Sequence, residues 1–484
     1  MNFPTDKKIA VIGAGMSGIL AAIKLSEAGC RDVTVYEKSE RLGGTWRDNT
    51  YPGLSCDVPS HHYTYSFEPN PEWSRHFVGG EEIHGYFDRA AKKYQVADKI
   101  VYGHEVKSAR FEAKRWHIEF VNGREEVVDI MIAATGVLHH PVTPDIPGLE
   151  DFAGAKFHSA RWDHSVSLKN KRVGVIGTGS TGMQIVPAIV DDTSHLSLFQ
   201  RTAQWVLPLP NSEYSEEEKA EFRAAPELMR ELYDKWANQF THSFSRAVIG
   251  GKDELKKIAD ICELNLDTNV HDPVLREKLR PDYVVACKRL VMSDQFYPAI
   301  QKPNAALVTS SITHIEAAGV RTEDGRLHEL DVLVLATGFN GHSYMRPMEL
   351  TGRDGLKLSE VWQDSAEAYR SIGIPGFPNF FMMVGPNSPI GNFSVIMISE
   401  MQLDYIMQLI SHVDRAGKSE IEPSMVATQR FNESVKEAMK GTVWMTGCKS
   451  WYLDKNGNPT LWPWTFERYQ QEMATPELED FQLA

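Results

Sequence analysis

The chain has 484 residues, a length that exceeds one ordinary hydrophobic core and predicts two or three domains. Hydrophobic residues make up 42% and charged residues 24%, as in soluble globular proteins, and no apolar run reaches the roughly 20 residues that a membrane span needs. The formal net charge of −14 argues against nucleic acid and against an anionic membrane as partners.

The cysteines are scattered along the chain and odd in number. None of them forms a C-x-x-C pair, so a structural disulfide framework, a thioredoxin-like redox pair and a zinc ribbon all lack support. We therefore expect a reducing, cytoplasmic setting, no metal site and no obligate protein partner. The five cysteines are Cys30, Cys56, Cys262, Cys287 and Cys448.

The first predicted elements are a buried strand over residues 8–12, a glycine-rich turn, and a helix through Leu25. The turn reads Gly13-Ala14-Gly15-Met16-Ser17-Gly18, which is the G-x-G-x-x-G pattern. In this pattern the first glycine makes the tight turn, the second lets the backbone approach a pyrophosphate, and the third lets helix pack on strand. The helix N-terminus then receives the phosphate charge. Gly13, Gly15, Ser17 and Gly18 are therefore candidate dinucleotide contacts.

The same plan recurs in the middle of the chain. A buried strand over residues 172–176 precedes Gly177-Thr178-Gly179-Ser180-Thr181-Gly182, and a second helix follows. All six residues of this turn are candidate contacts of a second dinucleotide. One G-x-G-x-x-G pattern can be an incidental glycine turn, but two copies in the same strand–turn–helix context favour nucleotide binding.

A charged residue follows the second strand of each unit. The strand over 33–36 ends at Glu37, and the strand over 196–199 leads to Arg201; each charge lies 24 residues beyond the first glycine of its motif. An acid at this place accepts hydrogen bonds from a ribose 2′-hydroxyl, whereas an arginine pairs with a 2′-phosphate. The first unit therefore favours FAD or NAD and the second NADP(H), with the adjoining Lys38 and Thr202 as further candidate contacts. The alternative is that both charges are solvated strand ends.

A second element is also repeated. Residues 129–136 and 331–338 share the pattern D-x-x-x-x-A-T-G. This pattern predicts a buried strand that ends in a turn of small residues, where the chain passes close to a nucleotide. The alternative is an ordinary core strand that meets a loop.

Residues 211–280 follow a break at Pro208 and Pro210 and are charge-rich and helix-prone. An apolar helical face predicts that this segment packs on the main body and helps to cover a substrate cleft. That face comprises Met229, Leu232, Tyr233, Trp236 and Phe240. We expect an α/β protein with two Rossmann-like dinucleotide-binding domains and a helical insertion in the NADP domain. The expected ranges are 1–145 with 375–484 for the FAD-binding domain, 146–210 with 281–374 for the NADP-binding domain, and 211–280 for the insertion.

Two nucleotide sites indicate a flavin-dependent oxidoreductase. NADPH delivers hydride to the flavin, and the reduced flavin passes electrons onward. A disulfide as the acceptor would need a cysteine pair near the flavin, and the sequence offers none at recognisable spacing. A protein, a quinone and dioxygen stay open as acceptors at this point.

Two longer patterns lie outside the glycine turns. Residues 152–163, Phe-Ala-Gly-Ala-Lys-Phe-His-Ser-Ala-Arg-Trp-Asp, resemble the F-x-G-x-x-x-H-x-x-x-W-[P/D] fingerprint of type I Baeyer–Villiger monooxygenases. A second pattern of that family is matched by Gly43-Gly44-Thr45-Trp46, Tyr51-Pro52-Gly53 and Asp57. The resemblance implies an FAD- and NADPH-dependent enzyme that inserts one atom of O2 beside a ketone carbonyl through a peroxyflavin. The products are esters or lactones, and sulfides are further candidate substrates.

The resemblance also implies roles for residues near two basic segments. Arg289, in Cys287-Lys288-Arg289-Leu290, would stabilise the anionic peroxyflavin and the later tetrahedral adduct. Asp57 would orient Arg289, and Lys288 would contact NADP. Trp451, in Lys449-Ser450-Trp451-Tyr452, would close over the nicotinamide.

Other family positions are expected to serve binding or domain motion. Gly44, Thr45 and Trp46 are candidate cofactor contacts, whereas His158 and Trp162 would serve the linker between domains. Two features depart from the family: Asn340 stands where many relatives have aspartate, and the tail over 457–464 differs from that of cyclohexanone-type members. The tail leaves the identity of the ketone open.

Simpler explanations exist for the same residues. A Lys-Arg pair is usually a solvated surface charge, Asp57 could cap a local turn, and Trp451 could belong to the core. The histidine pairs at 61–62 and 139–140 lack partners at metal-ligand spacing and are interpreted as structural. Two alternative functions also stay open: a flavin monooxygenase acting mainly on sulfur or nitrogen, and an FAD/NADP redox sensor without turnover.

Overall fold

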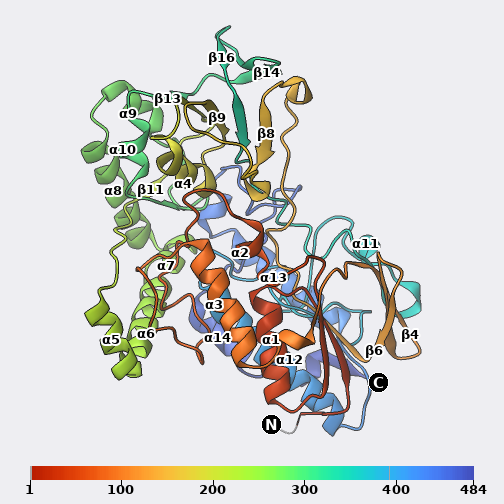
Figure 1. The fold of residues 1–484 in the computed structure, drawn as a ribbon. Helices are drawn as coiled ribbons and strands as arrows, with labels where there is room; N and C mark the ends of the chain where they lie inside the picture. Colours follow the sequence, from red (N-terminus) through yellow and green to blue (C-terminus); the bar gives the residue numbers. More distant parts are fainter. Residues whose placement is uncertain (1–2, 392) are drawn as a thin grey trace.

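Two five-stranded parallel sheets form the centre of the computed structural model, which describes residues 3–391 and 393–484 (Figure 1). Each sheet has the strand that precedes a glycine motif in its middle. The first sheet runs β19 (Phe380–Met382), β7 (Ile130–Ala133), β1 (Lys8–Ile12), β2 (Asp32–Tyr36), β3 (Ile100–Val101). The second runs β8 (Ala155–His158), β17 (Val332–Leu335), β9 (Arg172–Ile176), β10 (His195–Phe199), β13 (Ala305–Val308). These twin sheets confirm the α/β class and the repeated plan.

An aspartate fastens the start of each central strand. The backbone N–H of Lys8 donates to the Asp129 carboxylate at 2.8 Å, and the N–H of Arg172 donates to the Asp331 carboxylate, also at 2.8 Å. Each aspartate opens one copy of the repeated D-x-x-x-x-A-T-G pattern and immediately precedes β7 or β17. The repeated acid therefore has a structural role, because it satisfies a backbone donor where two neighbouring strands begin.

The central strand β1 is buried on both faces, as its continuous apolar sequence predicts. Ile9 and Val11 face a core shared with helices, whereas Ala10 and Ile12 face a core shared with an antiparallel sheet. That antiparallel sheet has the order β18 (Glu349–Thr351), β4 (Val106–Glu112), β5 (Arg115–Phe120), β6 (Glu125–Val128), with β18 running parallel to β4. A three-stranded sheet packs in the same way on the second parallel sheet: β14 (Ile312–Glu316), β15 (Gly319–Thr322), β16 (Leu327–Glu329).

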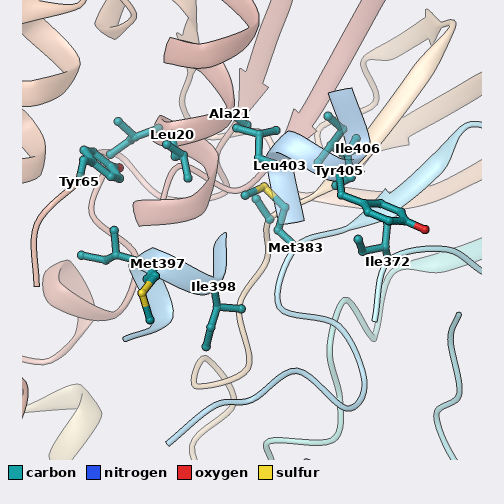
Figure 2. Packing of buried hydrophobic residues seen from close by; sticks show 14 of the residues in the cluster. Leu20, Ala21, Tyr65, Ile372, Met383, Met397, Ile398, Leu403, Tyr405 and Ile406 are labelled. Carbon is teal, nitrogen blue, oxygen red and sulfur yellow. The ribbon is translucent and has the colours of Figure 1, made fainter. Parts of the chain in front are cut away.

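Helix α12 (Val395–Arg415) packs against α1 (Met16–Glu27), the helix that follows the first glycine motif. Figure 2 shows Leu20 and Ala21 of α1 among the buried side chains of α12, which include Leu403 and Ile406. At the N-terminal ends of these helices the hydroxyls of Ser17 and Ser399 lie 2.9 Å apart. The C-terminal part of the chain therefore returns to support the first glycine motif.

The segment over 211–280 contains five helices: α5 (Glu216–Ala224), α6 (Pro226–His242), α7 (Phe244–Val248), α8 (Lys252–Asn269), α9 (Pro273–Leu279). They form the left flank of the molecule in Figure 1. Met229 and Tyr233 of α6 are buried, and Leu232, Trp236 and Phe240 are half-buried. The predicted apolar face therefore packs on the main body.

The remaining helices connect these layers. They are α2 (Thr45–Asp48), α3 (Gly80–Lys93), α4 (Ser180–Ile189), α10 (Phe296–Ile300), α11 (Leu358–Val361), α13 (Met425–Met439) and α14 (Phe466–Ala474). Two short strand pairs complete the fold: β11 (Val206–Leu207) with β12 (Val291–Met292), and β20 (Ile421–Pro423) with β21 (Phe481–Leu483). Among the described residues, no helix combines the length and the apolar character needed to cross a membrane.

His61 and His62 lie where the helical insertion meets the main body. The His61 ring contacts Tyr214 and Phe222, and the His62 ring lies edge-on to Tyr233. The nitrogens of both rings are buried and have no hydrogen-bond partner in the described part of the chain. Burial lowers the pKa of each imidazole from 6.5 to about 4, because the charged form loses its hydration.

We predict that this contact makes stability depend on pH. The unfolded chain binds more protons than the folded chain between pH 6.5 and 4, so stability is complete above this window and falls as the pH drops through it. Each histidine contributes at most about 1.4 kcal/mol per pH unit. Urea unfolding at pH 7.5 and 5 measures the effect. His62→Phe should weaken the pH dependence, whereas the same change at exposed His271 should leave it intact; an unchanged dependence in both variants would contradict the assignment.

Candidate active site

One cavity of about 680 Å³ connects the two glycine motifs. It brings together residues that the sequence predicted as contacts of two different nucleotides. From the first half these are Gly13, Gly15, Ser17, Glu37, Lys38, Gly44, Thr45, Trp46 and Asp57. From the second half they are Gly179, Ser180, Thr181, Lys288, Arg289 and Trp451. The other predicted contacts, Gly18, Gly177, Thr178, Gly182, Arg201 and Thr202, flank the cavity without lining it.

Glu37 holds the first end of the cavity. Its carboxylate accepts the backbone N–H of Ala14 at 2.8 Å and that of Ser39 at 2.9 Å, and it pairs with the buried Arg47 at 3.0 Å. A carboxylate offers about four lone-pair sites, so capacity is left for a ribose hydroxyl. Arg47 holds the Glu37 carboxylate in place. The sequence analysis missed Arg47, although it directly follows the matched Gly43–Trp46 segment.

The backbone leaves open space where a dinucleotide would pass. Gly15 and Gly44 approach each other closely, since a Cβ added to Gly44 would lie 3.0 Å from the Gly15 Cα. Gly136 and Gly338, which end the two A-T-G turns, have no other atom within 4 Å of the place where a Cβ would point, and both line the cavity. The open space beside these two glycines fits the prediction that each A-T-G turn passes close to a nucleotide.

At the second end of the cavity Lys288 lines the wall and Arg201 flanks it. Neither Arg201 nor Lys288 forms an ion pair with any residue between 3 and 391 or between 393 and 484. Burial, and then the nearby charge of Arg201, lowers the pKa of Lys288. The charge of Asp282 acts on Lys288 in the opposite direction without forming an ion pair with it, and two neighbouring cations of this kind fit a phosphate group. The predicted NADP end therefore has the charge that a 2′-phosphate requires.

Arg289 and Asp57 form an ion pair at the cavity wall, although they are 232 positions apart in the chain. The pKa of Arg289 lies above its ordinary value, chiefly because of the Asp57 charge. The Arg289 side chain is 33% exposed and lines the cavity, so its positive charge faces the space between the two glycine motifs. The structure thus brings together the two residues that the sequence predicted as catalytic.

Tyr452 is a second neighbour of Arg289 that the sequence analysis did not identify. Gly391, at φ +87°, lies against both side chains, since a Cβ added there would be 3.0 Å from the Tyr452 hydroxyl and 3.2 Å from an Arg289 nitrogen. Burial raises the pKa of Tyr452, and the Arg289 charge opposes that rise. The hydroxyl therefore stays protonated beside the guanidinium. Nothing in the local sequence signals this contact, because three distant segments make it.

The Tyr51-Pro52-Gly53 part of the second family pattern forms a contact with helix α4. The Tyr51 hydroxyl donates to the Gln184 side chain at 2.8 Å, and the Gln184 amide donates to the Ser55 carbonyl at 3.0 Å. A Cβ added to Gly53 would lie 2.4 Å from the Gln184 carbonyl oxygen. This pattern therefore fixes the segment before Asp57 against the helix of the second glycine motif.

Aromatic side chains form part of the cavity wall. Trp451 packs on Gly341, where an added Cβ would lie 3.3 Å from its ring. Phe240 and Phe244, from the helical insertion, line the same cavity, and so does Phe393. The expectation that the 211–280 segment helps to cover the cleft agrees with this placement.

The family fingerprint over 152–163 lies at the edge of the second parallel sheet. His158 ends β8, where its Nδ1 accepts the backbone N–H of Ala160 at 3.1 Å and its Nε2 lies 3.1 Å from the Gly338 carbonyl. The Trp162 ring packs edge-on to Phe157, and neither His158 nor Trp162 lines the cavity. These contacts link the edge strand to the turn at Gly338, which does line the cavity.

The histidine pair at 139–140 lies at the cavity wall and bonds to backbone. The two rings are 4.0 Å apart, and their Nε2 atoms lie 2.7 Å from the carbonyls of Tyr344 and Arg346. Among the described residues, no three His, Cys, Asp or Glu side chains are grouped as metal ligands would be.

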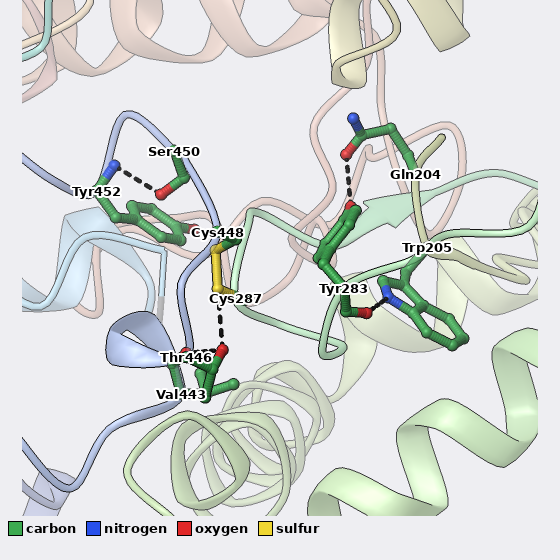
Figure 3. The surroundings of a disulfide bond; sticks show 9 residues. All are labelled: Gln204, Trp205, Tyr283, Cys287, Val443, Thr446, Cys448, Ser450 and Tyr452. Carbon is green, nitrogen blue, oxygen red and sulfur yellow. Dashed lines mark hydrogen bonds between the residues drawn. A yellow bond between two sulfur atoms is a disulfide. The ribbon is translucent and has the colours of Figure 1, made fainter. Parts of the chain in front are cut away.

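One prediction about the cysteines is wrong. Cys287 and Cys448 form a disulfide, with their Cα atoms 6.2 Å apart (Figure 3). The two residues are separated by 161 positions, so no local spacing reveals the pair. Cys30, Cys56 and Cys262 are buried and free. The argument for a reducing setting from unpaired cysteines therefore loses its premise.

Comparisons of sequence agree with the site. Residues 6–220 match the family model described as flavin-binding monooxygenase-like. A Baeyer–Villiger monooxygenase of Streptomyces coelicolor is 40% identical over 484 aligned residues, covering 98% of this chain and 92% of that protein. An uncharacterized monooxygenase of Mycobacterium tuberculosis is 48% identical over 475 residues, covering 98% of this chain and 96% of the relative.

Solved structures agree as well. A closed structure of cyclohexanone monooxygenase superposes with a TM-score of 0.88 at 28% identity, covering 99% of both chains. The structure of OTEMO in complex with FAD and NADP gives 0.87 at 28% identity, covering 99% of this chain and 100% of that one. An oxidized steroid monooxygenase bound to NADP also gives 0.87 at 28%, covering 99% of both chains. The chain belongs to the Baeyer–Villiger monooxygenases, which are FAD- and NADPH-dependent enzymes.

Proposed function

We propose that this enzyme uses NADPH and O2 to convert a small ketone into an ester or a lactone, with Arg289 as the cation at the reacting centre. The observation that carries the proposal is the Asp57–Arg289 ion pair on a cavity shared by both glycine motifs. Bound FAD, once reduced by NADPH, supplies the chemistry that transfers oxygen.

Arg289 would stabilise negative charge as it develops on the transferred oxygen and on the carbonyl oxygen of the ketone. Its charge is permanent, because the Asp57 carboxylate holds its pKa above the ordinary value. Asp57 on one side and Tyr452 on the other leave the guanidinium little freedom to turn away. A donor fixed in advance costs no reorganisation when charge forms, and this is the main reason why such groups accelerate reactions.

Other residues of the wall would bind and enclose the reactants. Lys288 and Arg201 would hold the 2′-phosphate of NADPH, and Glu37 would accept a ribose hydroxyl of FAD. Trp451 would cover the nicotinamide. Phe240 and Phe244 would exclude water on the side of the helical insertion.

The domain boundaries follow from the same proposal. We assign 1–145 with 375–484 to FAD and 146–210 with 281–374 to NADP, except that β18 (Glu349–Thr351) pairs with β4 and packs with the first sheet. Support comes from β19 (Phe380–Met382), which joins the first sheet although it follows the whole second sheet in sequence. The helices over 211–280 connect β11 to β12, which pair directly.

Arg289→Ala tests the catalytic assignment. We expect ester formation to fall by about 10²–10³, because one donor to a developing oxyanion is lost, while NADPH still reduces the flavin. A ketone panel with gas chromatography measures ester, and stopped-flow absorbance measures flavin reduction. The control is Arg161→Ala, since Arg161 is exposed and its guanidinium bonds only to its neighbour's carbonyl. Normal ester formation by Arg289→Ala would remove this residue from the mechanism. Thioether oxidation by the wild-type enzyme without any ester from the ketone panel would overturn the ketone assignment.

Arg201→Ala tests the phosphate site. Loss of one charge-assisted hydrogen bond costs about 1.5–3 kcal/mol, so the KM for NADPH should rise by about 10- to 100-fold. The KM for NADH, which lacks the 2′-phosphate, should barely change. Steady-state kinetics with both nucleotides decides the matter, and an equal increase for both would refute the role.

The second glycine motif offers a matched pair of variants. A Cβ added to Gly179 meets no other atom within 4 Å, whereas one added to Gly182 would lie 2.1 Å from the Gly177 carbonyl oxygen. Gly179→Ala should therefore fold normally and weaken NADPH binding, because the new methyl occupies the approach to the pyrophosphate. Gly182→Ala should instead lower the melting temperature. Thermal unfolding and NADPH titration of the FAD-bound variants separate the two effects, and normal NADPH affinity in Gly179→Ala would contradict this prediction.

A further inference from the structure

The disulfide between Cys287 and Cys448 joins the segment that carries Arg289 to the segment that carries Trp451 and Tyr452. Cys287 lies two residues before Arg289, and Cys448 lies three residues before Trp451. Both cysteines belong to the core around the first sheet, whereas Val291, four residues after Cys287, belongs to the core around the second sheet. The cross-link therefore acts where the chain passes from one unit to the other.

The segment after Cys448 has one buried anchor, Tyr452, between exposed stretches. Lys449 and residues 455–458 are exposed, whereas Tyr452 is buried and packs against Trp444. The side chains of Lys455 and Asn456 donate to the carbonyls of Gln363 and Asp364 at the surface. Between these points Trp451 and Tyr452 reach the cavity wall and Arg289. The disulfide is the covalent attachment at the start of this segment, so its loss would let the segment open more often and would weaken the contacts of both aromatic side chains.

The two sulfur atoms differ in access. Cys287 is fully buried, whereas Cys448 is 9% exposed and precedes an exposed lysine. The Thr446 hydroxyl lies 3.3 Å from the Cys287 sulfur, and Lys288 and Arg289 follow that cysteine directly. This hydroxyl favours a thiolate at Cys287, because a hydrogen-bond donor stabilises the charged form. An external thiolate would therefore attack the sulfur of Cys448 and release Cys287.

We propose that Cys287 and Cys448 form a redox-modification site that takes a small dithiol as reductant and controls how the 446–460 segment covers the active site. One thiolate of the dithiol attacks Cys448, which forms a mixed disulfide and frees the Cys287 thiolate. The second thiolate of the dithiol then attacks the dithiol sulfur that is bound to Cys448. This closes the ring of the dithiol and frees the Cys448 thiolate. The dithiol becomes a cyclic disulfide, and its two protons end on the two cysteines. Two electrons are transferred in total.

The functional consequence rests on the role proposed for Arg289. In the oxidised protein Tyr452 stays against the guanidinium and Trp451 stays on Gly341. Reduction loosens both contacts, so NADPH oxidation continues with less ester and more hydrogen peroxide. The redox state of the two cysteines thereby controls what fraction of the oxidised NADPH leads to ester.

The test uses FAD-bound protein purified without reductant. Peptide mapping after alkylation should find Cys287 and Cys448 linked, and incubation with dithiothreitol should make both alkylatable. Native trypsin cleavage after Lys449 and Lys455 should become about tenfold faster after reduction, because cleavage follows the population of the opened segment. Cys448→Ser should be cleaved at the fast rate with or without dithiothreitol.

Cys30→Ser is the matched control. Cys30 is a buried free cysteine whose sulfur lies 3.4 Å from the Lys7 carbonyl, so this variant should respond to dithiothreitol like the wild type. The proposal would be overturned if Cys287 and Cys448 alkylate fully without reduction. It would also be overturned if trypsin cleaves the wild type equally fast before and after reduction. If Cys448→Ser does not fold, reduction of the wild type still decides it. If Arg289 proves to have no role in ester formation, the effect of reduction on trypsin cleavage would still be expected. Only the predicted shift from ester to hydrogen peroxide would be lost.

Discussion

The ion pair between Asp57 and Arg289 is the interaction on which the arrangement of this molecule depends. A cation that faces a partly closed cavity needs a fixed partner, since an unpaired charge away from water costs several kcal/mol. The partner here comes from the first nucleotide unit, and the arginine follows the helical insertion of the second. The contact of Gly53 with α4 fixes the segment before Asp57 against the helix of the second glycine motif. The ion pair therefore connects the two halves of the candidate active site.

Much of the fold could be predicted, because the signals are short and repeated. Strand, glycine turn and helix recur in contiguous stretches, and the charges at Glu37 and Arg201 follow at equal offsets. The two sheets bear this out, with corresponding strands in corresponding positions. One detail had no counterpart in the expectation: the aspartates at 129 and 331 fasten the central strands, while the A-T-G turns that end the same pattern line the cavity as predicted.

The rest could not be predicted, because it depends on contacts between distant segments. Tyr452 reaches Arg289 through a glycine at position 391, and no local pattern connects these three positions. The Cys287–Cys448 bond was missed for the same reason, since an odd number of scattered cysteines suggests free thiols. Arg47 was missed differently. It lies beside a matched motif, but only the fold shows that its charge is buried against Glu37.

The distribution of charge explains how an acidic protein can bind two anionic cofactors. The chain carries a net charge of −14, yet Lys288 and Arg289 line the cavity, and the charge of Arg201 acts on Lys288 from beside it. Asp57 neutralises only Arg289, so two positive charges remain for phosphate. At the other end Glu37 offers a carboxylate beside open glycine backbone, which suits a ribose hydroxyl. A local field outweighs the net charge here, because cavity walls of low dielectric constant screen less than water does. Under the proposed function the same contrast would orient the two nucleotides, since Lys288 and Arg201 would attract the additional phosphate that NADPH carries and FAD lacks.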